Sequence, residues 1–216
     1  MSPDRCSVLI FAKAPQPGQV KTRLIPALGE QGAANLHKQL LHHEIVEAIR
    51  ADIGPVELWC APDTHDDFFI ACFKEFAISL HRQQGADLGE KMAHALDDAL
   101  SRAPRALLIG SDCPMLDAAY LRQAATKLTK NNRVVIAPTQ DGGYSLVGAS
   151  GNIPSIFCDI AWSTARVMSQ TRERLHKQNI PWHELPRVWD VDTPDDLAKL
   201  RAWLAFASGP QTQEAC

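Results

Sequence analysis

Short apolar runs alternate with longer segments of helical periodicity along most of this chain. The runs of strand length lie at residues 7–12, 56–61, 78–82, 106–109 and 134–137, with a further strand-like run at 145–147. Helical patterns occupy residues 30–51, 65–74, 88–102, 118–130, 164–178 and 195–205. Such alternation is typical of βαβ units, in which a crossover helix connects two parallel strands. We therefore predict an α/β, Rossmann-like fold with a mostly parallel central sheet flanked by helices.

The length and composition of the chain predict one globular domain. Of its 216 residues, 45% are hydrophobic and 22% are charged, as in an ordinary soluble protein. We assign residues 1–207 to this domain and expect residues 208–216 to form a flexible tail. No apolar window approaches the roughly 18 residues of a transmembrane helix, and no signal-peptide pattern follows Met1. We expect a cytoplasmic protein without a membrane span.

Charge and cysteine content argue against several other classes of protein. A formal net charge of -3 predicts no general attraction to nucleic acid, so any phosphate-binding charge must be local. The six cysteines form no C-x-x-C pair, and Cys6, Cys60 and Cys158 lie in apolar runs, where we expect reduced core thiols. The histidines of the long first helix, including His37, are expected on its polar surface and not as metal ligands.

The loop after the first predicted strand carries three cations within eleven residues. Lys13, Lys21 and Arg23 are spaced by prolines and by Gly18, which suits an extended loop around phosphate oxygens. The loop matches neither a Walker motif nor the G-x-G-x-x-G fingerprint, which disfavours a P-loop NTPase or an NAD enzyme. A solvated basic loop is the alternative interpretation.

Two further loops at strand ends carry acidic residues. Asp112 follows the apolar strand at 106–109, where a carboxylate can bind Mg²⁺ together with substrate oxygens. Asp117 is the better candidate for the cap of the next helix, which leaves Asp112 for chemistry. The segment Asp141-Gly142-Gly143 is either a functional loop or only a hairpin turn.

A last acidic segment precedes the final predicted helix. Asp192 is a candidate helix cap, whereas Asp190 has no obvious structural task. Carboxylates that are brought close together resist joint ionisation unless a cation lies between them. If Asp112 converges with Asp190 and Asp192, a divalent ion, Mg²⁺ or Mn²⁺, is the simplest resolution, with the basic loop beside the same phosphates.

These motifs, in this order, resemble the DUF2064 family over residues 7–204. The matching segments are Phe-Ala-Lys-Ala-Pro at 11–15, Pro-Gly at 17–18, Val-Lys-Thr-Arg-Leu at 20–24, and residues 84–92, 110–114, 141–144 and 190–194. Members of this family are described as GT-A-type glycosyltransferases with a nucleotide-diphospho-sugar transferase fold. The architecture is also similar to that of 2-phospho-lactate guanylyltransferase and molybdopterin guanylyltransferase. The Asp-x-Asp motif usual in glycosyltransferases is reduced here to Ser111-Asp112-Cys113.

The resemblance implies a role for several individual residues. It implies nucleotide contacts at the first loop, at residues 85–89 and at the end of the strand before Asp112: Ala12, Lys13, Gly18, Lys21, Arg23, Gly85, Asp87, Leu88, Gly89 and Ser111. It implies metal ligands at Asp112, Asp190 and Asp192. The residues expected to take part in catalysis are Lys21, Arg23, Asp112 and Asp141.

Three functions remain open from the sequence. The first is metal-dependent glycosyl transfer from a nucleotide-diphospho-sugar donor to an unknown acceptor, with Asp141 as base or sugar-hydroxyl ligand. The second is transfer of a nucleotide from an NTP to a phosphorylated small molecule, with Lys21 and Arg23 stabilising the charge on phosphate. The third is a non-catalytic nucleotide-binding module. Trp162 and Trp189 are candidates for lining the acceptor pocket, and a homodimer is among the expected states.

Overall fold

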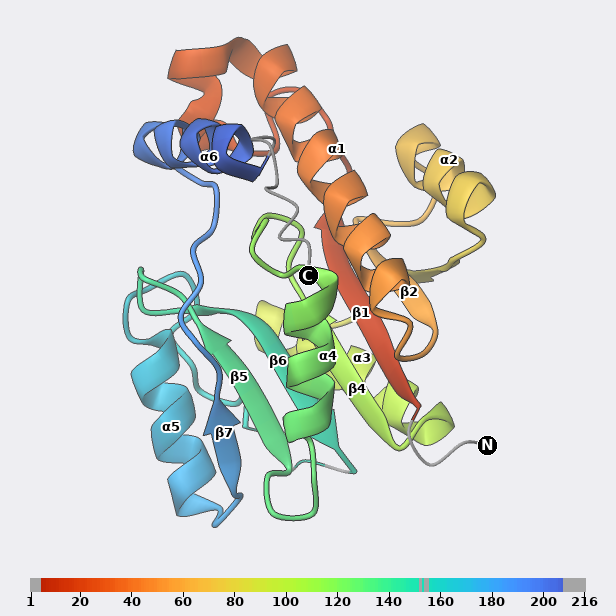
Figure 1. Cartoon of the computed structure of the whole chain (residues 1–216), viewed down its shortest axis with the longest axis vertical. Helices are drawn as coiled ribbons and strands as arrows, with labels where there is room; N and C mark the ends of the chain where they lie inside the picture. Colours follow the sequence, from red (N-terminus) through yellow and green to blue (C-terminus); the bar gives the residue numbers. More distant parts are fainter. Residues whose placement is uncertain (1–4, 152, 154–155, 208–216) are drawn as a thin grey trace, which may run out of the picture.

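A seven-stranded sheet organises the chain, of which the computed structural model describes residues 5–151, 153 and 156–207 (Figure 1). The strand order is β3-β2-β1-β4-β6-β5-β7. The strands are β1 (Cys6–Lys13), β2 (Val56–Ala61), β3 (Ser79–Arg82), β4 (Arg105–Ile109), β5 (Val134–Pro138), β6 (Tyr144–Ser150) and β7 (Trp182–Glu184). Only β6 runs antiparallel to its neighbours, β4 and β5. The predicted mostly parallel sheet is therefore confirmed, and β7 is a strand that the sequence analysis missed.

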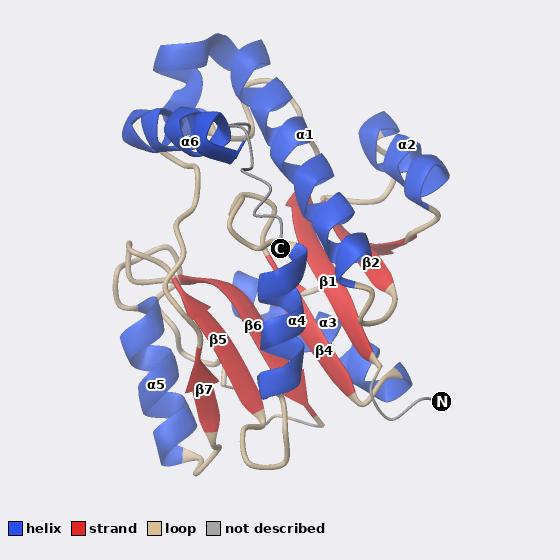
Figure 2. Cartoon of the chain, viewed as in Figure 1, coloured by secondary structure: helices blue, strands red, loops and turns tan. Residues whose placement is uncertain are grey.

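Helices cover both faces of this sheet (Figure 2). They are α1 (Ile25–Ala51), α2 (Asp67–Phe76), α3 (Leu88–Arg102), α4 (Ala118–Lys127), α5 (Val167–Lys177) and α6 (Pro194–Ala207), with a short 3-10 helix, η1 (Thr22–Leu24), before α1. Helix α1 begins earlier than predicted and has a break at Gly29, whose φ of 70° and ψ of 167° are non-helical. Helix α5 begins later than predicted, at Val167, and residues 164–166 form a turn before it.

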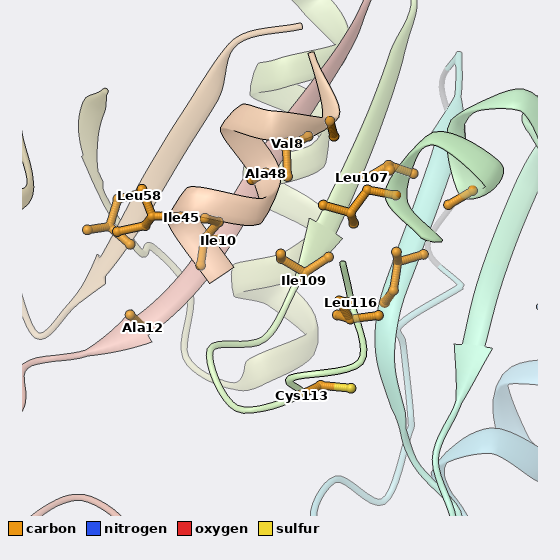
Figure 3. Close-up of a cluster of buried hydrophobic side chains, with 14 of the residues drawn as sticks. Val8, Ile10, Ala12, Ile45, Ala48, Leu58, Leu107, Ile109, Cys113 and Leu116 are labelled. Atoms are coloured by element: carbon orange, nitrogen blue, oxygen red, sulfur yellow. The ribbon is translucent and has the colours of Figure 1, made fainter. Parts of the chain in front are cut away.

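The core has one layer on each face of the sheet because successive side chains of a strand point to opposite faces. Val8, Ile10 and Ala12 of β1 pack in a cluster with α1, α2 and α4, whereas Leu9 and Phe11 pack with α3 and α5. Figure 3 shows the first cluster, which extends to the loop after β4 through Cys113 and Leu116. Burial on both faces explains why the central strands read as continuous apolar runs.

Burial corrects one expectation about the cysteines. Cys6 and Cys60 are buried free thiols, as expected, but Cys158 is exposed. It lies in the turn that follows Phe157 and precedes Asp159, whose φ of 52° is left-handed, so this apolar stretch forms no strand. The predicted tail at residues 208–216 lies outside the described residues. Among the described residues, none of the helices combines the length and apolar character that a bilayer crossing requires.

The topology brings four segments together at one edge of the sheet, the one formed by the carboxyl ends of the parallel strands. Strands β1 and β4 are parallel neighbours, so the loops after Lys13 and Ile109 leave the sheet side by side. The antiparallel β6 begins at this edge, which places the turn between Pro138 and Tyr144 there as well. The segment after β7 joins them, since the N–H of Val188 donates to Pro138 O at 3.0 Å.

Candidate functional site

The loop after β1 directs one lysine inward. Gly18 has a φ of 77°, and Lys21 itself adopts the left-handed conformation, with φ 47° and ψ 42°. Non-glycine residues rarely occupy this region, because Cβ approaches the carbonyl oxygen. The side chain of Lys21 is only 5% exposed, whereas that of Arg23 is 72% exposed. The loop thus buries one cation and presents another to solvent.

A buried acid of α1 binds the backbone of the loop after β4. Glu44 is fully buried, and its Oε1 accepts a hydrogen bond from the N–H of Cys113 at 3.1 Å. Its Oε2 has no hydrogen-bond partner among the described residues, and burial followed by the charge of Asp112 raises the pKa of Glu44 well above its usual value. On the other side, the N–H of Val191 donates to Asp112 O at 2.9 Å. Sequence reasoning missed Glu44, because nothing in a helical pattern marks a buried acid.

The predicted acidic and basic residues meet at this edge. Lys21 Nζ lies 2.8 Å from Asp112 Oδ2 and 3.9 Å from Asp192 Oδ1. Arg23 donates to Asp192 Oδ2 at 2.6 Å. Asp190 accepts a hydrogen bond from the hydroxyl of Ser145. Burial, followed by the nearby Asp112 carboxylate, raises the pKa of Asp190 to about 7.

The structure separates capping residues from those that face the site. Asp117 caps α4 by accepting from the N–H of Tyr120 at 2.7 Å, as predicted. The capping role considered for Asp192 belongs instead to Thr193 and Asp196, because Asp196 Oδ2 accepts from the N–H of Thr193 at 2.9 Å. The side chain of Asp192 is therefore available to the cations.

Asp141 has a structural task at the β5–β6 turn and also faces a cavity. Its Oδ1 accepts from the hydroxyl of Thr139 and from the N–H of Gly143, the latter at 3.0 Å. Gly142 has a φ of 91°, and a Cβ there would lie 2.3 Å from Ala165 O. The segment thus forms a hairpin turn, and a function for Asp141, whose exposed carboxylate lines the cavity, stays a prediction.

Two adjoining hollows meet at these residues. The first, which we name the β1–β4 cleft, has a volume of about 420 Å³ and includes Ala12, Lys13, Lys21, Arg23, His37, Gln83, Leu88, Ser111, Asp112 and Asp192 in its lining. The second, the acidic cavity, has a volume of about 540 Å³ and includes Arg23, Leu88, Met92, Asp112, Asp141, Tyr144, Trp162, Ser163, Asp190 and Asp192. They share Arg23, Leu88, Asp112 and Asp192.

Several residues implied by the resemblance also have structural roles in the described part of the chain, and their contacts with nucleotide stay a prediction. Asp87 caps α3 by accepting from the N–H of Glu90 at 2.8 Å, and Gly85 has a φ of 141° just before it. Gly89 is buried beneath Trp162, whose ring would lie 2.9 Å from an added Cβ. Gly18 shapes the loop after β1. The lining of the β1–β4 cleft includes Leu88 of this group.

His37 corrects the prediction that the α1 histidines lie on the surface. It is 5% exposed, lines the β1–β4 cleft, and its Nε2 lies 3.0 Å from the carbonyl oxygen of Lys13. Since a carbonyl only accepts, Nε2 must carry the proton. Burial is the main cause that lowers the pKa of His37, which favours the neutral ring. The period of the helix did not reveal that the β1 loop covers this face.

The carboxylates of Asp112 and Asp192 suit a divalent cation, because they supply oxygen ligands on either side of one cationic group, the amine of Lys21. Mg²⁺ commonly takes one or two protein carboxylates and completes its shell with water and phosphate oxygens. Within the described residues, a different group of acidic and histidine ligand atoms lies close together, formed by Glu57, His81 and Asp98. Arg102 already pairs with Glu57 at 2.6 Å and with Asp98 at 2.5 Å, so a guanidinium already binds both carboxylates of that group.

Trp162 and Trp189 lie where the sequence analysis expected them, beside the site. Trp162 is part of the wall of the acidic cavity. Trp189 lines a smaller neighbouring hollow of about 230 Å³ that also includes Asp141, Asp190 and Asp192. Their role in holding an acceptor remains a prediction.

The sheet order and the acidic and basic edge define a chain of the nucleotide-diphospho-sugar transferase fold class. A proposed nucleotide-diphospho-sugar transferase from Desulfovibrio desulfuricans G20 is 31% identical, with a TM-score of 0.85 over 94% of this chain and 89% of that one. The chain belongs to the DUF2064 family, described as uncharacterized proteins conserved in bacteria, whose model matches residues 40–164.

More distant structures share the fold alone. A cytidylyltransferase from Leptospira borgpetersenii serovar Hardjo-bovis (strain JB197) is 14% identical, with a TM-score of 0.61 over 94% of this chain and 87% of that chain. The manganese complex of Rv0371c from Mycobacterium tuberculosis H37Rv is 17% identical, with a TM-score of 0.54 over 91% of this chain and 97% of that chain. No curated protein matches the sequence.

Proposed function

We propose that this protein is a transferase that moves a glycosyl group from a nucleotide-diphospho-sugar to a neutral hydroxyl acceptor, with Mg²⁺ or Mn²⁺. The β1–β4 cleft would hold the nucleotide, with its diphosphate near Lys21 and Arg23. The acidic cavity would hold the sugar and the acceptor. The relative from Desulfovibrio desulfuricans, a proposed nucleotide-diphospho-sugar transferase, supports the choice of donor in this proposal.

The charge of the acidic cavity is the observation that carries the proposal. The described residues of its lining include one cationic group, the guanidinium of Arg23, which is already paired. They also include four carboxyl groups, those of Asp112, Asp141, Asp190 and Asp192. Arg23 is the one cationic side chain among the described residues of this lining, so beyond a metal held by the aspartates a phosphorylated acceptor would find no free cation there. A hydroxyl group can instead donate to a carboxylate, and the rings of Tyr144 and Trp162 offer an apolar wall.

Each residue has a role that follows from its position. Lys21 and Arg23 would bind the oxygens of the departing diphosphate, where negative charge develops during transfer. A bound divalent metal would add Lewis-acid stabilisation of the same charge. Asp112, with Asp190 or Asp192, would hold that metal. Asp141 would accept the proton of the acceptor hydroxyl or bind a sugar hydroxyl, and its turn hydrogen bonds would fix its orientation.

Nucleotidyl transfer remains the second candidate. The fold is shared with a cytidylyltransferase, and Lys21 and Arg23 would equally suit the α-phosphate of an NTP. The two reactions differ in their products, because glycosyl transfer releases a nucleoside diphosphate and nucleotidyl transfer releases pyrophosphate.

The products therefore test the proposal. The purified protein would be incubated with Mn²⁺, NDP-sugars or NTPs, and either a pool of neutral sugars and glycosides or a pool of their phosphate monoesters. We expect release of nucleoside diphosphate with the neutral pool, and a loss of about 100-fold or more in Asp141→Asn if this residue is the general base. Release of pyrophosphate with the phosphorylated pool would establish nucleotidyl transfer instead.

A further inference from the structure

The amine of Lys21 occupies the space between two carboxylates that are suited to a metal. Its Nζ lies 2.8 Å from Asp112 and 3.9 Å from Asp192, and its side chain is 5% exposed. Lys13, on the same loop, is exposed and has no ion pair among those of the described residues. The inward position is built into the loop, because the left-handed backbone at Lys21 is followed by a hydrogen bond from the N–H of Leu24 to Lys21 O at 2.8 Å.

An ammonium group and a divalent cation compete for such a place. Both are attracted to the same carboxylate oxygens, and they repel each other at short distance. A metal ion can bind Asp112 fully only after the amine has moved away. Lysine can make this move easily, because its ammonium is a point charge on a flexible chain with several rotatable bonds.

Phosphate offers the amine a second partner. Lys21 lines the β1–β4 cleft together with Arg23, so an anion bound there would be within reach of its flexible side chain. When the amine turns to this anion, Asp112 Oδ2 and Asp192 Oδ1 become available to a cation, while Asp192 Oδ2 stays paired with Arg23. The two binding events then favour each other, and by linkage the effect is equal in both directions.

We infer that Lys21 is an internal counter-ion that closes the metal site until nucleotide phosphates draw its amine away, so that metal and nucleotide bind with positive coupling. The inference rests on the proposed function for the identity of the ligands. Lys21 acts here as a positioning residue. Its removal should therefore strengthen the binding of Mn²⁺ alone, which the removal of a simple phosphate-binding lysine would not do.

Binding of Mn²⁺ alone tests this role without any nucleotide or sugar. Free Mn²⁺ would be measured by electron paramagnetic resonance during titration of the wild type and of Lys21→Asn, Lys21→Arg and Lys13→Asn. Asparagine removes the charge and tolerates the left-handed backbone, so Lys21→Asn should fold. We expect it to bind Mn²⁺ about tenfold more tightly than the wild type, in the range of ordinary coupling effects. Lys21→Arg and Lys13→Asn should remain close to the wild type.

A second measurement applies if Lys21→Asn is less stable than the wild type. If Lys21→Asn melts at a lower temperature, Mn²⁺ should raise its melting temperature more than it raises that of the wild type, because ligands stabilise the state they bind. Equal Mn²⁺ affinity in the wild type and Lys21→Asn would overturn the counter-ion role and leave the proposed transfer reaction intact. If no variant binds Mn²⁺ and the affinity for nucleotide is also independent of Mn²⁺, both the counter-ion role and the proposed metal-dependent transfer are overturned.

Discussion

Asp112, just after β4, interacts with both basic and acidic residues of the site. Its carboxylate pairs with Lys21 and borders both hollows, and after burial it is the next cause that raises the pKa values of Glu44 and Asp190. The sequence placed this acid at a strand end, which is where ligands gather in open α/β sheets. The three-dimensional neighbours explain why an acid is tolerated there, since Lys21 supplies the compensating charge.

Asp112→Asn should weaken the metal-dependent part of nucleotide binding. We expect a loss of about 10- to 100-fold in affinity in the presence of Mn²⁺, as for altered metal environments in general, and little change without metal. Isothermal titration of the variant with and without Mn²⁺ measures both quantities. Asp97→Asn, at an exposed position of α3, is the matched control. Unchanged metal dependence in Asp112→Asn would remove this residue from the metal site.

The buried acid Glu44 predicts a pH dependence of stability. Its pKa is raised above the usual 4.5, so the folded state binds more protons at this group than the unfolded state. Stability from this group is complete below pH 4.5 and is lost as the pH rises above that value. Glu44→Gln keeps an acceptor for the N–H of Cys113 and cannot ionise. It should therefore gain stability relative to the wild type as the pH increases from 5 to 8.

Thermal unfolding at several pH values between 5 and 8 measures this effect. The difference in melting temperature between Glu44→Gln and the wild type should grow steadily with pH. Glu173→Gln, which removes an exposed carboxylate of α5, should show no such growth. A constant difference for Glu44→Gln across the range would mean that Glu44 carries no unusual proton.

At the scale of elements, the β5–β6 turn links Asp141 to the start of α5. Gly142 O accepts from the N–H of Met168 at 2.8 Å, and the turn itself is closed by the N–H of Thr139 donating to Gly143 O at 3.0 Å. The sequence predicted a turn here from Asp-Gly-Gly, but contact with α5 is a long-range feature that turn propensity does not encode.

A pair of glycine substitutions separates backbone strain from packing at this turn. Gly142 and Gly151 both have positive φ, of 91° and 71°, but only at Gly142 would a Cβ meet backbone, at 2.3 Å from Ala165 O. Gly151→Ala should cost about 1 kcal/mol in the free energy of unfolding from its backbone alone. Gly142→Ala should cost clearly more and also lower activity, as chemical denaturation and product assays would show. Equal losses of stability would mean that the turn yields to the clash.

At the scale of the whole molecule, the sequence predicted the architecture better than the shape of the site. Helix α3 has the predicted bounds, because its apolar stripe and its capping Asp87 are both local signals. Strand β7 was missed, since its three partly exposed residues form no apolar run. The convergence of Asp112, Asp190 and Asp192 was inferred correctly as a hypothesis, but the inward Lys21 and the buried Glu44 and His37 depend on contacts across the fold.

Calorimetric titration with a panel of NTPs and of UDP-, GDP- and dTDP-sugars, each with and without Mg²⁺ or Mn²⁺, tests the central claim most directly. We predict that one nucleotide-diphospho-sugar binds more tightly than every NTP, and that its affinity rises when the metal is present. Tighter metal-dependent binding of an NTP would contradict glycosyl transfer and favour nucleotidyl transfer. Binding of neither class would contradict the assignment of the β1–β4 cleft as a nucleotide site.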